Sequence, residues 1–319
     1  MDKYVNRRLL APALFGEVLL CTDAMTRRDV VVKAMDLDRA AAHATTDGLP
    51  VHEDIAMEKR VYTQMQLHGG HANILQLLAC FEADGRDHFV LEYASRGDLF
   101  SQLRTQQRFR ALEARAYFHN ITAGLAFLHD HGFAHGDLSL ENVVLTADNT
   151  CKLMDFGLAA ARANGPRTIA VGKYFYMAPE VFLGKPYDAA TADMWSLGML
   201  LLIMLTGLPP FGKANCTDPV FVAYQTHGIR TILKGWKVLQ YCSDDAIDLI
   251  ERLLVEDPAK RFCMQQVLSH PFLARPKSPP SPTQDRIKKR VRVQNFFRRL
   301  FRGKRGGSSL DLLANSQWH

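Results

Sequence analysis

His135-Gly-Asp-Leu-Ser-Leu-Glu-Asn142 is the stretch that decides the fold, together with Asp155-Phe-Gly157, which begins thirteen positions after Asn142. Asp137 can accept a proton, while the side chains of Asn142 and Asp155 offer the oxygen atoms that a hard cation prefers. Each string is weak evidence by itself. Their order, with Ala178-Pro-Glu180 after them, indicates a site that holds Mg²⁺ against a triphosphate.

Together these strings resemble the eukaryotic protein kinase family, and the resemblance covers about residues 5 to 273. Val30-Val-Val-Lys33 predicts a strand that carries an ammonium group toward phosphates, and Met57 to Met65 has helical spacing. In this family Glu58, on that helix, would pair with Lys33. The resemblance implies an ATP-dependent phosphotransferase that uses Mg²⁺.

The same resemblance implies an α+β fold of two lobes. Apolar spacing predicts helices from Ala111 to His131 and from Asp244 to Leu254. We expect the main small-lobe helix to start near Pro50, after a loop from Ala40 to Gly48. The expected divisions are a small, strand-rich lobe at 4–92, a larger, mainly helical lobe at 93–273, and a basic, flexible tail at 274–319.

Further positions take their expected roles from the family. Leu91 would be the gatekeeper, the backbone of Glu92 and Ala94 would bond the adenine edge, and Asp98 would reach the ribose or a basic substrate side chain. Asp193 would brace the catalytic-loop backbone, and Arg261 would be the buried partner of Glu180. Other residues expected to line the nucleotide site are Ala11, Gly16, Val18, Val31 and Val144.

Charge is divided unequally along the 319 residues, whose net charge is +6. From Arg275 onward, twelve Lys and Arg face two acidic residues, whereas the first 274 residues carry 27 basic and 31 acidic side chains. The globular part is therefore acidic, which argues against a nucleic-acid binder. The six cysteines are scattered and predict reduced, packed thiols of a cytosolic protein rather than a disulfide or zinc framework.

We expect no secretory segment at the start of this sequence, because Arg7 and Arg8 interrupt its apolar residues. The most apolar stretch, Gly198 to Leu208, is too short to span a bilayer, so it predicts a buried core helix. Among the twelve histidines, only His135 has an expected place, beneath the catalytic loop.

The segment expected to cover the nucleotide departs from the family pattern of three glycines. Only Gly16 remains, with Ala11 and Ala13 at the other two places and Pro12 between them. Pro12 fixes φ and removes an amide donor, which would give a stiffer lid and weaker ATP affinity. Alternatively, alanine is small enough, and Phe15 and Val18 still cap the sugar and adenine. We favour the second interpretation because the metal and lysine positions are intact.

A second departure is Gly136, where most kinases have an arginine that binds a phosphorylated residue and so orders the activation segment. Residues 155–180 offer only Thr168 near the expected phosphorylation position, which itself holds Ile169. We therefore expect activity that does not require phosphorylation of this segment.

The remaining departures form a pair. Serine/threonine kinases usually have lysine at the place of Ser139 and threonine at the place of Lys173, and in the family fold these positions touch. We expect a swap, in which Lys173 brings the missing ammonium back to Asp137 and the γ-phosphate, because transferring phosphoryl oxygens need cations. The alternative is that Lys173 points to solvent and the protein is a pseudokinase, a nucleotide-binding scaffold with little turnover.

Three places in the chain resemble the pattern of serine/threonine kinases, and they are most similar to the calcium/calmodulin-dependent kinase group. They are Glu141, Gly97-Asp-Leu-Phe100 and Ser269-His-Pro-Phe272. Residues 285–302 mix cations with large apolar side chains, which predicts binding of calmodulin or of an anionic membrane surface. Nuclear import through Lys288-Lys-Arg290, or a solvated arm without a partner, would also fit this composition. The sequence leaves the oligomeric state and the protein substrate open.

Overall fold

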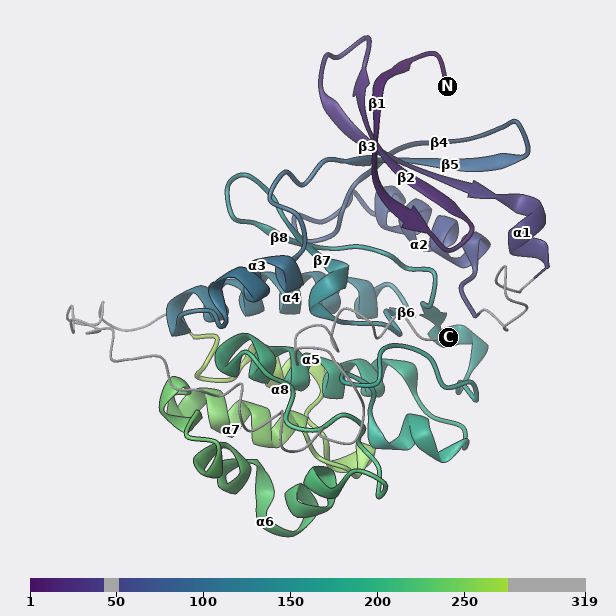
Figure 1. Ribbon diagram of the computed structural model, residues 1–319. Helices are drawn as coiled ribbons and strands as arrows, with labels where there is room; N and C mark the ends of the chain where they lie inside the picture. Colours follow the sequence, from purple (N-terminus) through teal and green to yellow (C-terminus); the bar gives the residue numbers. More distant parts are fainter. Residues whose placement is uncertain (43–51, 275–319) are drawn as a thin grey trace, which may run out of the picture.

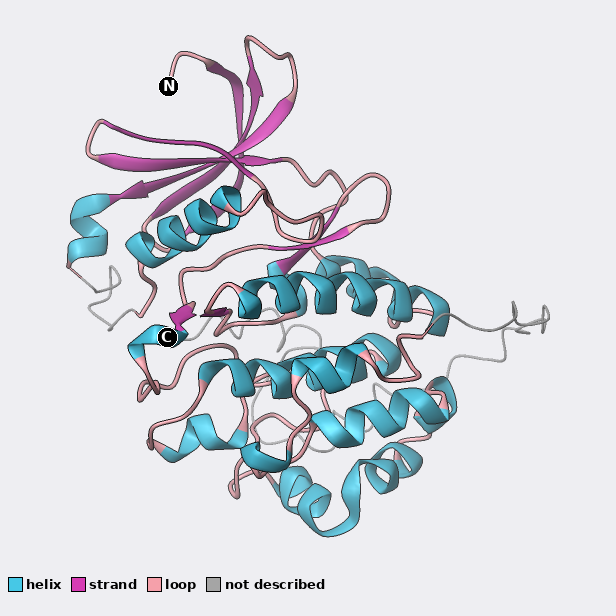
Figure 2. Cartoon of the chain, turned by 180° about the vertical axis from the view of Figure 1, so that it is seen from behind, coloured by secondary structure: helices cyan, strands magenta, loops and turns pink. Residues whose placement is uncertain are grey.

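The computed structural model of the chain describes residues 1–42 and 52–274. Two lobes are stacked one above the other, a strand-rich lobe at the top of Figure 1 and a larger helical lobe below it. Figure 2 shows the same division from behind, with most of the strands gathered in the upper lobe. The expected tail, including residues 285–302, lies outside the described residues.

The small lobe is one five-stranded antiparallel sheet with the strand order β1-β2-β3-β5-β4. Helix α2 lies beside this sheet, on the side that faces the large lobe (Figure 1). The elements of the lobe are β1 (Tyr4–Ala13), β2 (Gly16–Asp23), β3 (Asp29–Asp36), α1 (Leu37–Ala41), α2 (Ile55–Leu67), β4 (Leu77–Ala83) and β5 (Arg86–Glu92).

Two small-lobe boundaries differ from the prediction. Helix α2 begins at Ile55 rather than near Pro50, because the carboxylate of Asp54 caps it by accepting a hydrogen bond from the amide of Met57. The short helix α1 includes Ala40 and Ala41, where the sequence predicts a loop. Most of that loop lies outside the described residues.

The large lobe is mainly helical, as predicted, and its helices at 111–130 and 244–253 agree closely with the apolar spacing. Helix α6 is kinked at Gly228, whose φ is +72°. The elements are α3 (Leu99–Gln106), α4 (Ala111–Asp130), β6 (Phe133–Ala134), β7 (Val143–Leu145), β8 (Cys151–Leu153), β9 (Ala160–Ala161), α5 (Ala189–Thr206), α6 (Pro219–Gly235), α7 (Asp244–Leu253) and α8 (Met264–Leu268).

Helix α5 is the centre of the large lobe, and 83% of it is buried inside the protein. It has 18 residues and is apolar enough to pass a length and composition test for a membrane span. The sequence argument that this helix is too short to span a bilayer, based on Gly198 to Leu208 alone, was therefore wrong. Its conclusion, a buried core helix, is confirmed by the burial of α5.

All six cysteines are free thiols, as predicted. Cys21 and Cys151 are buried, which agrees with their expected packing as small apolar side chains. Cys216 and Cys263 are exposed, so the prediction that all the cysteines pack as small apolar side chains is wrong for these two.

The large lobe positions the catalytic loop through short strands. Strand β6 ends at Ala134, the chain then passes through residues 135–139, and a 3₁₀ turn at Leu140–Asn142 leads into β7. Because β7 pairs with β8, and Asp155 follows β8 closely, the loop and Asp155 are brought to the same end of this hairpin.

Candidate active site

Lys33 enters the site from the central strand of the small lobe. Its Nζ donates to both carboxylate oxygens of Glu58, at 2.9 and 2.8 Å, and to Oδ1 of Asp155 at 3.1 Å. Burial opposes the charge of Lys33, but Asp155 and Glu58 raise its pKa well above the ordinary value. Burial raises the pKa of Glu58 to about 7, against the attraction of Lys33.

Helix α2 is fixed against Asp155-Phe-Gly157 by two contacts. The amide of Asp54 donates to the carbonyl of Gly157 at 2.8 Å. Phe156 is fully buried, with its ring centroid 5.0 Å from that of Tyr62 on α2 and 5.3 Å from that of His135. These contacts hold Glu58 and Asp155 on either side of Lys33.

Asp193, at the start of α5, holds the catalytic-loop backbone from below. Its Oδ2 accepts from the amide of His135 at 2.7 Å and from His129 at 2.9 Å, and its Oδ1 accepts from the amide of Gly136 at 3.0 Å. This buried carboxylate has the bracing contacts that we expected of it, and His135 is buried beneath the loop.

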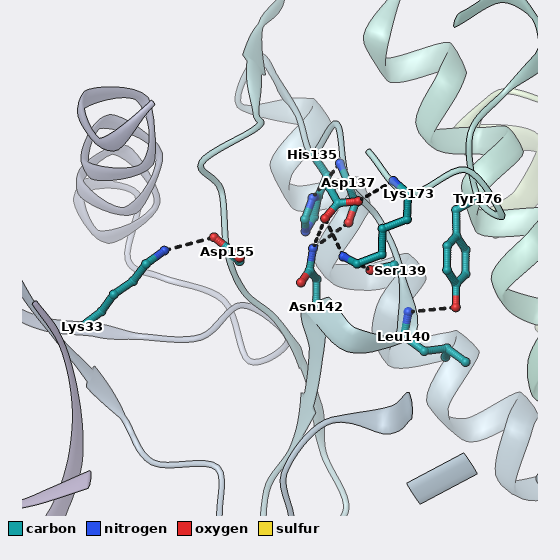
Figure 3. Close-up of polar contacts among 9 residues, drawn as sticks. All are labelled: Lys33, His135, Asp137, Ser139, Leu140, Asn142, Asp155, Lys173 and Tyr176. Carbon is teal, nitrogen blue, oxygen red and sulfur yellow. Dashed lines mark hydrogen bonds and ion pairs between the residues drawn. The ribbon is translucent and has the colours of Figure 1, made fainter. Parts of the chain in front are cut away.

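The centre of the site is a cluster of Asp137, Ser139, Asn142 and Lys173, drawn in Figure 3. Asn142 donates from its amide nitrogen to the backbone oxygen of Asp137 at 2.8 Å and to Oδ2 at 2.7 Å. Lys173 donates from Nζ to Oδ2 of Asp137 at 2.8 Å and to the hydroxyl of Ser139 at 3.2 Å. The structure therefore brings together the residues of the expected swap.

Lys173 is also fixed by its backbone, because its amide donates to Oδ1 of Asp137 at 3.1 Å. Its side chain is only 18% exposed, which rules out a lysine that points to solvent. Burial opposes the charge, but Asp137 and Glu141 raise the pKa of Lys173, so the side chain is an ammonium at neutral pH.

Asn142 and Asp155 fit the requirements of a Mg²⁺ site. The amide nitrogen of Asn142 is used by Asp137, which leaves its side-chain oxygen for a cation. Asp155 has a φ of +64°, an uncommon backbone conformation for a residue other than glycine, and Lys33 lowers the pKa of its carboxylate in spite of burial. The described residues contain no group of three or more His, Cys, Asp or Glu that could hold a metal, so the remaining ligands would be phosphate oxygens and water.

The comparisons with known proteins agree with this geometry. A family model described as a protein kinase domain matches residues 5–273. The chain belongs to the protein kinase family. It is similar to an Aurora kinase of Yarrowia lipolytica, with 30% identity over 276 residues that cover 86% of this chain and 69% of that protein.

Other kinases match over less of their own length. CBL-interacting protein kinase 16 of Oryza sativa is 32% identical over 287 residues, or 89% of this chain and 59% of that protein. Maternal embryonic leucine zipper kinase of Xenopus tropicalis is 31% identical over 264 residues, or 81% of this chain and 37% of that protein. The kinase domain is of the serine/threonine class, and these relatives support the expected likeness to the calcium/calmodulin-dependent group.

The sheet of the kinase gathers most of the expected nucleotide-site residues on one face. Val18 is the cross-strand partner of both Ala11 and Lys33, and Leu91 is the partner of Val31. Cross-strand partners point to the same face of a sheet, so these five residues share one face. Val144 lies opposite, on β7 of the large lobe.

Phe15 does not lie where we expected it. Instead of capping the sugar, its side chain is 3% exposed and lines a small cavity with Lys33, Met35 and Glu58. In the tight turn between β1 and β2, the carbonyl of Phe15 accepts from the amide of Asp36 at 2.8 Å, which fastens this turn to the end of β3.

Gly16 is required by the packing of the sheet. A Cβ atom at Gly16 would lie 2.0 Å from the carbonyl oxygen of Ala34 on the neighbouring strand β3. No side chain fits in that space, which explains why this glycine is retained where Ala11 and Ala13 replace the other two.

Residues near the hinge have additional structural roles. The carboxylate of Glu92 accepts from Lys152 at 2.6 Å and from the amide of Gln76 at 2.8 Å. Asp98 caps helix α3 by accepting from the amide of Ser101 at 2.7 Å. Ala94 is buried between these two. The expected contacts of Glu92, Ala94 and Asp98 with ATP remain predictions.

Arg261 forms the expected ion pair with Glu180, donating through both guanidinium ends at 2.6 and 2.9 Å. The same arginine lies over the ring of Trp195 in α5, with its guanidinium carbon 5.4 Å from the ring centroid. This pair fastens the end of the activation segment to the core of the large lobe.

The sequence did not identify Glu53, which lies beside Gly157 and lines the cavity with Lys33. Burial and the nearby charge of Asp155 raise the pKa of Glu53 to about 7. No motif quoted from the sequence includes this position, which belongs to the segment before α2. Its closeness to Lys33 can be seen only once α2 is packed against Gly157.

Proposed function

We propose that this kinase transfers the γ-phosphate of ATP to serine and threonine hydroxyls of proteins, with Lys173 as the cation that assists the transfer, and that it needs no phosphorylation of its activation segment. The observation that carries the proposal is the position of the Lys173 ammonium, 2.8 Å from Oδ2 of Asp137 and 3.2 Å from the hydroxyl of Ser139. A lysine at position 139 or at position 173 would supply the same positive charge beside the carboxylate of Asp137.

The chain's own groups divide the work of the reaction. Lys33, held by Glu58, would bind the α- and β-phosphates. Asp137 would orient the acceptor hydroxyl and take its proton as the new oxygen–phosphorus bond forms and ADP leaves. Lys173 would balance negative charge on the transferring group. Mg²⁺ bound to Asn142 and Asp155 would neutralise the phosphates.

Independence from phosphorylation is supported by Gly136. This residue offers no side chain to bind a phosphate, and Thr168 is exposed. The segment after Asp155 already reaches the catalytic loop through Lys173, whose backbone and side chain both bond Asp137.

The competing function is a pseudokinase. Ala11, Ala13 and the inward position of Phe15 favour it, because together they alter the segment that would contact phosphates. We favour an active kinase, because the residues expected to bind the phosphates and Mg²⁺ and to accept the proton are present and contact one another. These residues are Lys33, Glu58, Asp137, Asn142 and Asp155.

Replacing Thr168 by alanine tests whether phosphorylation is needed. We expect the untreated wild type, the phosphatase-treated wild type and the Thr168→Ala variant to phosphorylate a generic protein acceptor at similar rates, measured as kcat/KM. A loss of more than about tenfold in the variant, equal to about 1.4 kcal/mol of barrier, would contradict this part of the proposal.

A further inference from the structure

Gly136, the residue before the catalytic aspartate, has no room for a side chain. Its φ is +77°, and a Cβ atom built there would lie 2.2 Å from the carbonyl oxygen of Leu158 and 3.1 Å from Nη1 of Arg167. Even alanine would require the backbone to move. The space into which a side chain of residue 136 would project is therefore filled by another part of the chain.

The carbonyl of Leu158 fills most of this space, and beside it lies the guanidinium of Arg167, from the activation segment. Its Nη1 donates to the carbonyl of Leu158 at 2.6 Å, a short bond from a charged donor. Arg167 is half-buried, whereas Pro166 and Thr168 on either side of it are exposed. Burial lowers the pKa of its guanidinium, while Tyr187 and Asp193 act in the opposite direction. The carboxylate that braces the catalytic loop thus also attracts Arg167.

The backbone around Arg167 is held independently. Arg167 and Tyr187 exchange two backbone hydrogen bonds, each of 2.9 Å. The hydroxyl of Tyr187 donates to the carbonyl of Ile169 at 2.9 Å. Residues 167–169 are therefore fixed to residue 187 on one side, so the guanidinium is presented to the catalytic loop on the other.

Two functional segments meet at this guanidinium, and a third packs against Gly136. Leu158, whose carbonyl it binds, directly follows Asp155-Phe-Gly157. Gly136 directly precedes Asp137. Farther along the segment, a Cβ atom on Gly172 would lie 2.9 Å from the carbonyl oxygen of Gly136, and Lys173 is the next residue.

We propose that Arg167 is a positioning residue that orders residues 158–173, in place of the contact that an arginine before the catalytic aspartate makes with a phosphorylated residue. The chain thereby supplies from its activation segment the cation that Gly136 lacks, and does so without a modification. This inference rests on the proposed function, because it explains how Lys173 and Asp155 are held in the unphosphorylated enzyme.

The test compares full-length, phosphatase-treated variants. Arg167→Met keeps an unbranched apolar stem and removes the donors, Arg167→Lys keeps a donor, and Arg162→Met is a control at an exposed position of the same segment. Two quantities are measured: kcat and KM for MgATP and a generic protein acceptor, and amide hydrogen exchange of peptides that cover residues 158–173.

We expect Arg167→Met to lower kcat at least about tenfold and to change KM for MgATP less than about threefold, because the contacts of Lys33 with Glu58 are not touched. Exchange should become faster within 158–173 and stay unchanged in α4 and α5. Arg167→Lys should recover kcat to within about threefold of the wild type, and Arg162→Met should match the wild type.

The inference would be overturned if Arg167→Met had the same kcat and the same amide exchange as the wild type. Faster exchange throughout the large lobe of this variant would also overturn it, because that result would indicate a general structural role. Should the wild type show no turnover, the proposed function fails, and exchange alone decides the role of Arg167. Faster exchange confined to 158–173 would then support it, and unchanged exchange would refute it.

Discussion

We propose that Lys173 replaces the lysine that the family has at the position of Ser139. A transferring phosphoryl group needs positive charge nearby, and the strand or loop from which that charge comes matters less than where its ammonium lies. In this kinase the ammonium comes from the activation segment and contacts both Asp137 and Ser139. These contacts are what an exchange of the cation and the hydroxyl between the two family positions would require.

Replacing Lys173 by alanine should lower kcat by about 100-fold or more, because a cation is lost from a buried site. The double variant Ser139→Lys/Lys173→Thr should recover activity to within about tenfold of the wild type, since it restores the family arrangement. Steady-state rates at saturating MgATP measure both effects, with Lys185→Ala as an exposed control. A harmless single substitution, or a double variant no better than the single, would show that the exchange is not functional.

Glu58 should make the stability of the folded protein depend on pH. Burial raises its pKa from 4.5 to about 7, so the folded protein holds this proton more tightly than the unfolded chain. The free energy of unfolding should therefore decrease as pH rises through that interval, with a slope of up to about 1.4 kcal/mol per pH unit from this group.

In Glu58→Gln the titrating proton is absent, and the decrease should become shallower. Urea unfolding at several pH values between about 5 and 8 measures the slope. Glu53→Gln is the matched variant, because the pKa of Glu53 is also raised to about 7. Parallel slopes in the wild type and Glu58→Gln would mean that Glu58 is already ionised at the start of this interval.

The motifs and the resemblance to the kinase family were sufficient to predict the residues that meet at Asp137, because the family fold brings those positions together. They could not locate Glu53 or Arg167. Both residues act by filling space beside Gly157, Leu158 and Gly136, and space appears only when distant segments are packed together. The inward position of Phe15 was missed for the same reason.

At the scale of elements, alternation and spacing predicted the strands and helices better than their ends. Strand β3 and helix α5 follow directly from β-branched and apolar runs. The start of α2 depended on a single cap, Asp54, in a chain that offers several polar residues before the helix. The role of Gly16 could not be inferred either, because it depends on the distance between β2 and β3.

The turn between β1 and β2 gives a prediction for the sheet. Gly16→Ala should destabilise the kinase by about 2 kcal/mol or more, because its Cβ would meet the carbonyl oxygen of Ala34. In contrast, Ala11→Gly/Ala13→Gly should change KM for MgATP less than about threefold, since alanine already fits at these positions. Thermal unfolding and initial rates measure the two effects. A stable Gly16→Ala variant would refute the packing argument.

At the scale of the whole molecule, the two lobes bring groups from distant parts of the sequence to one place. Lys33 comes from the small lobe, and Asp137, Asp155 and Lys173 come from the large one (Figure 3). Glu58, which pairs with Lys33, also belongs to the small lobe. The charge imbalance between the acidic domain and the basic tail is a further property of the whole chain. Binding of residues 285–302 to calmodulin or an anionic membrane remains a prediction.

Transfer of radiolabelled phosphate from MgATP to a protein acceptor tests the central claim most directly. The full chain should label serine and threonine of the acceptor without prior phosphorylation, and Asp137→Asn should lower the rate by about 100-fold to 10,000-fold, because the proton acceptor is lost. No transfer by the wild type, or equal transfer by Asp137→Asn, would contradict the claim that these groups converge to perform phosphoryl transfer.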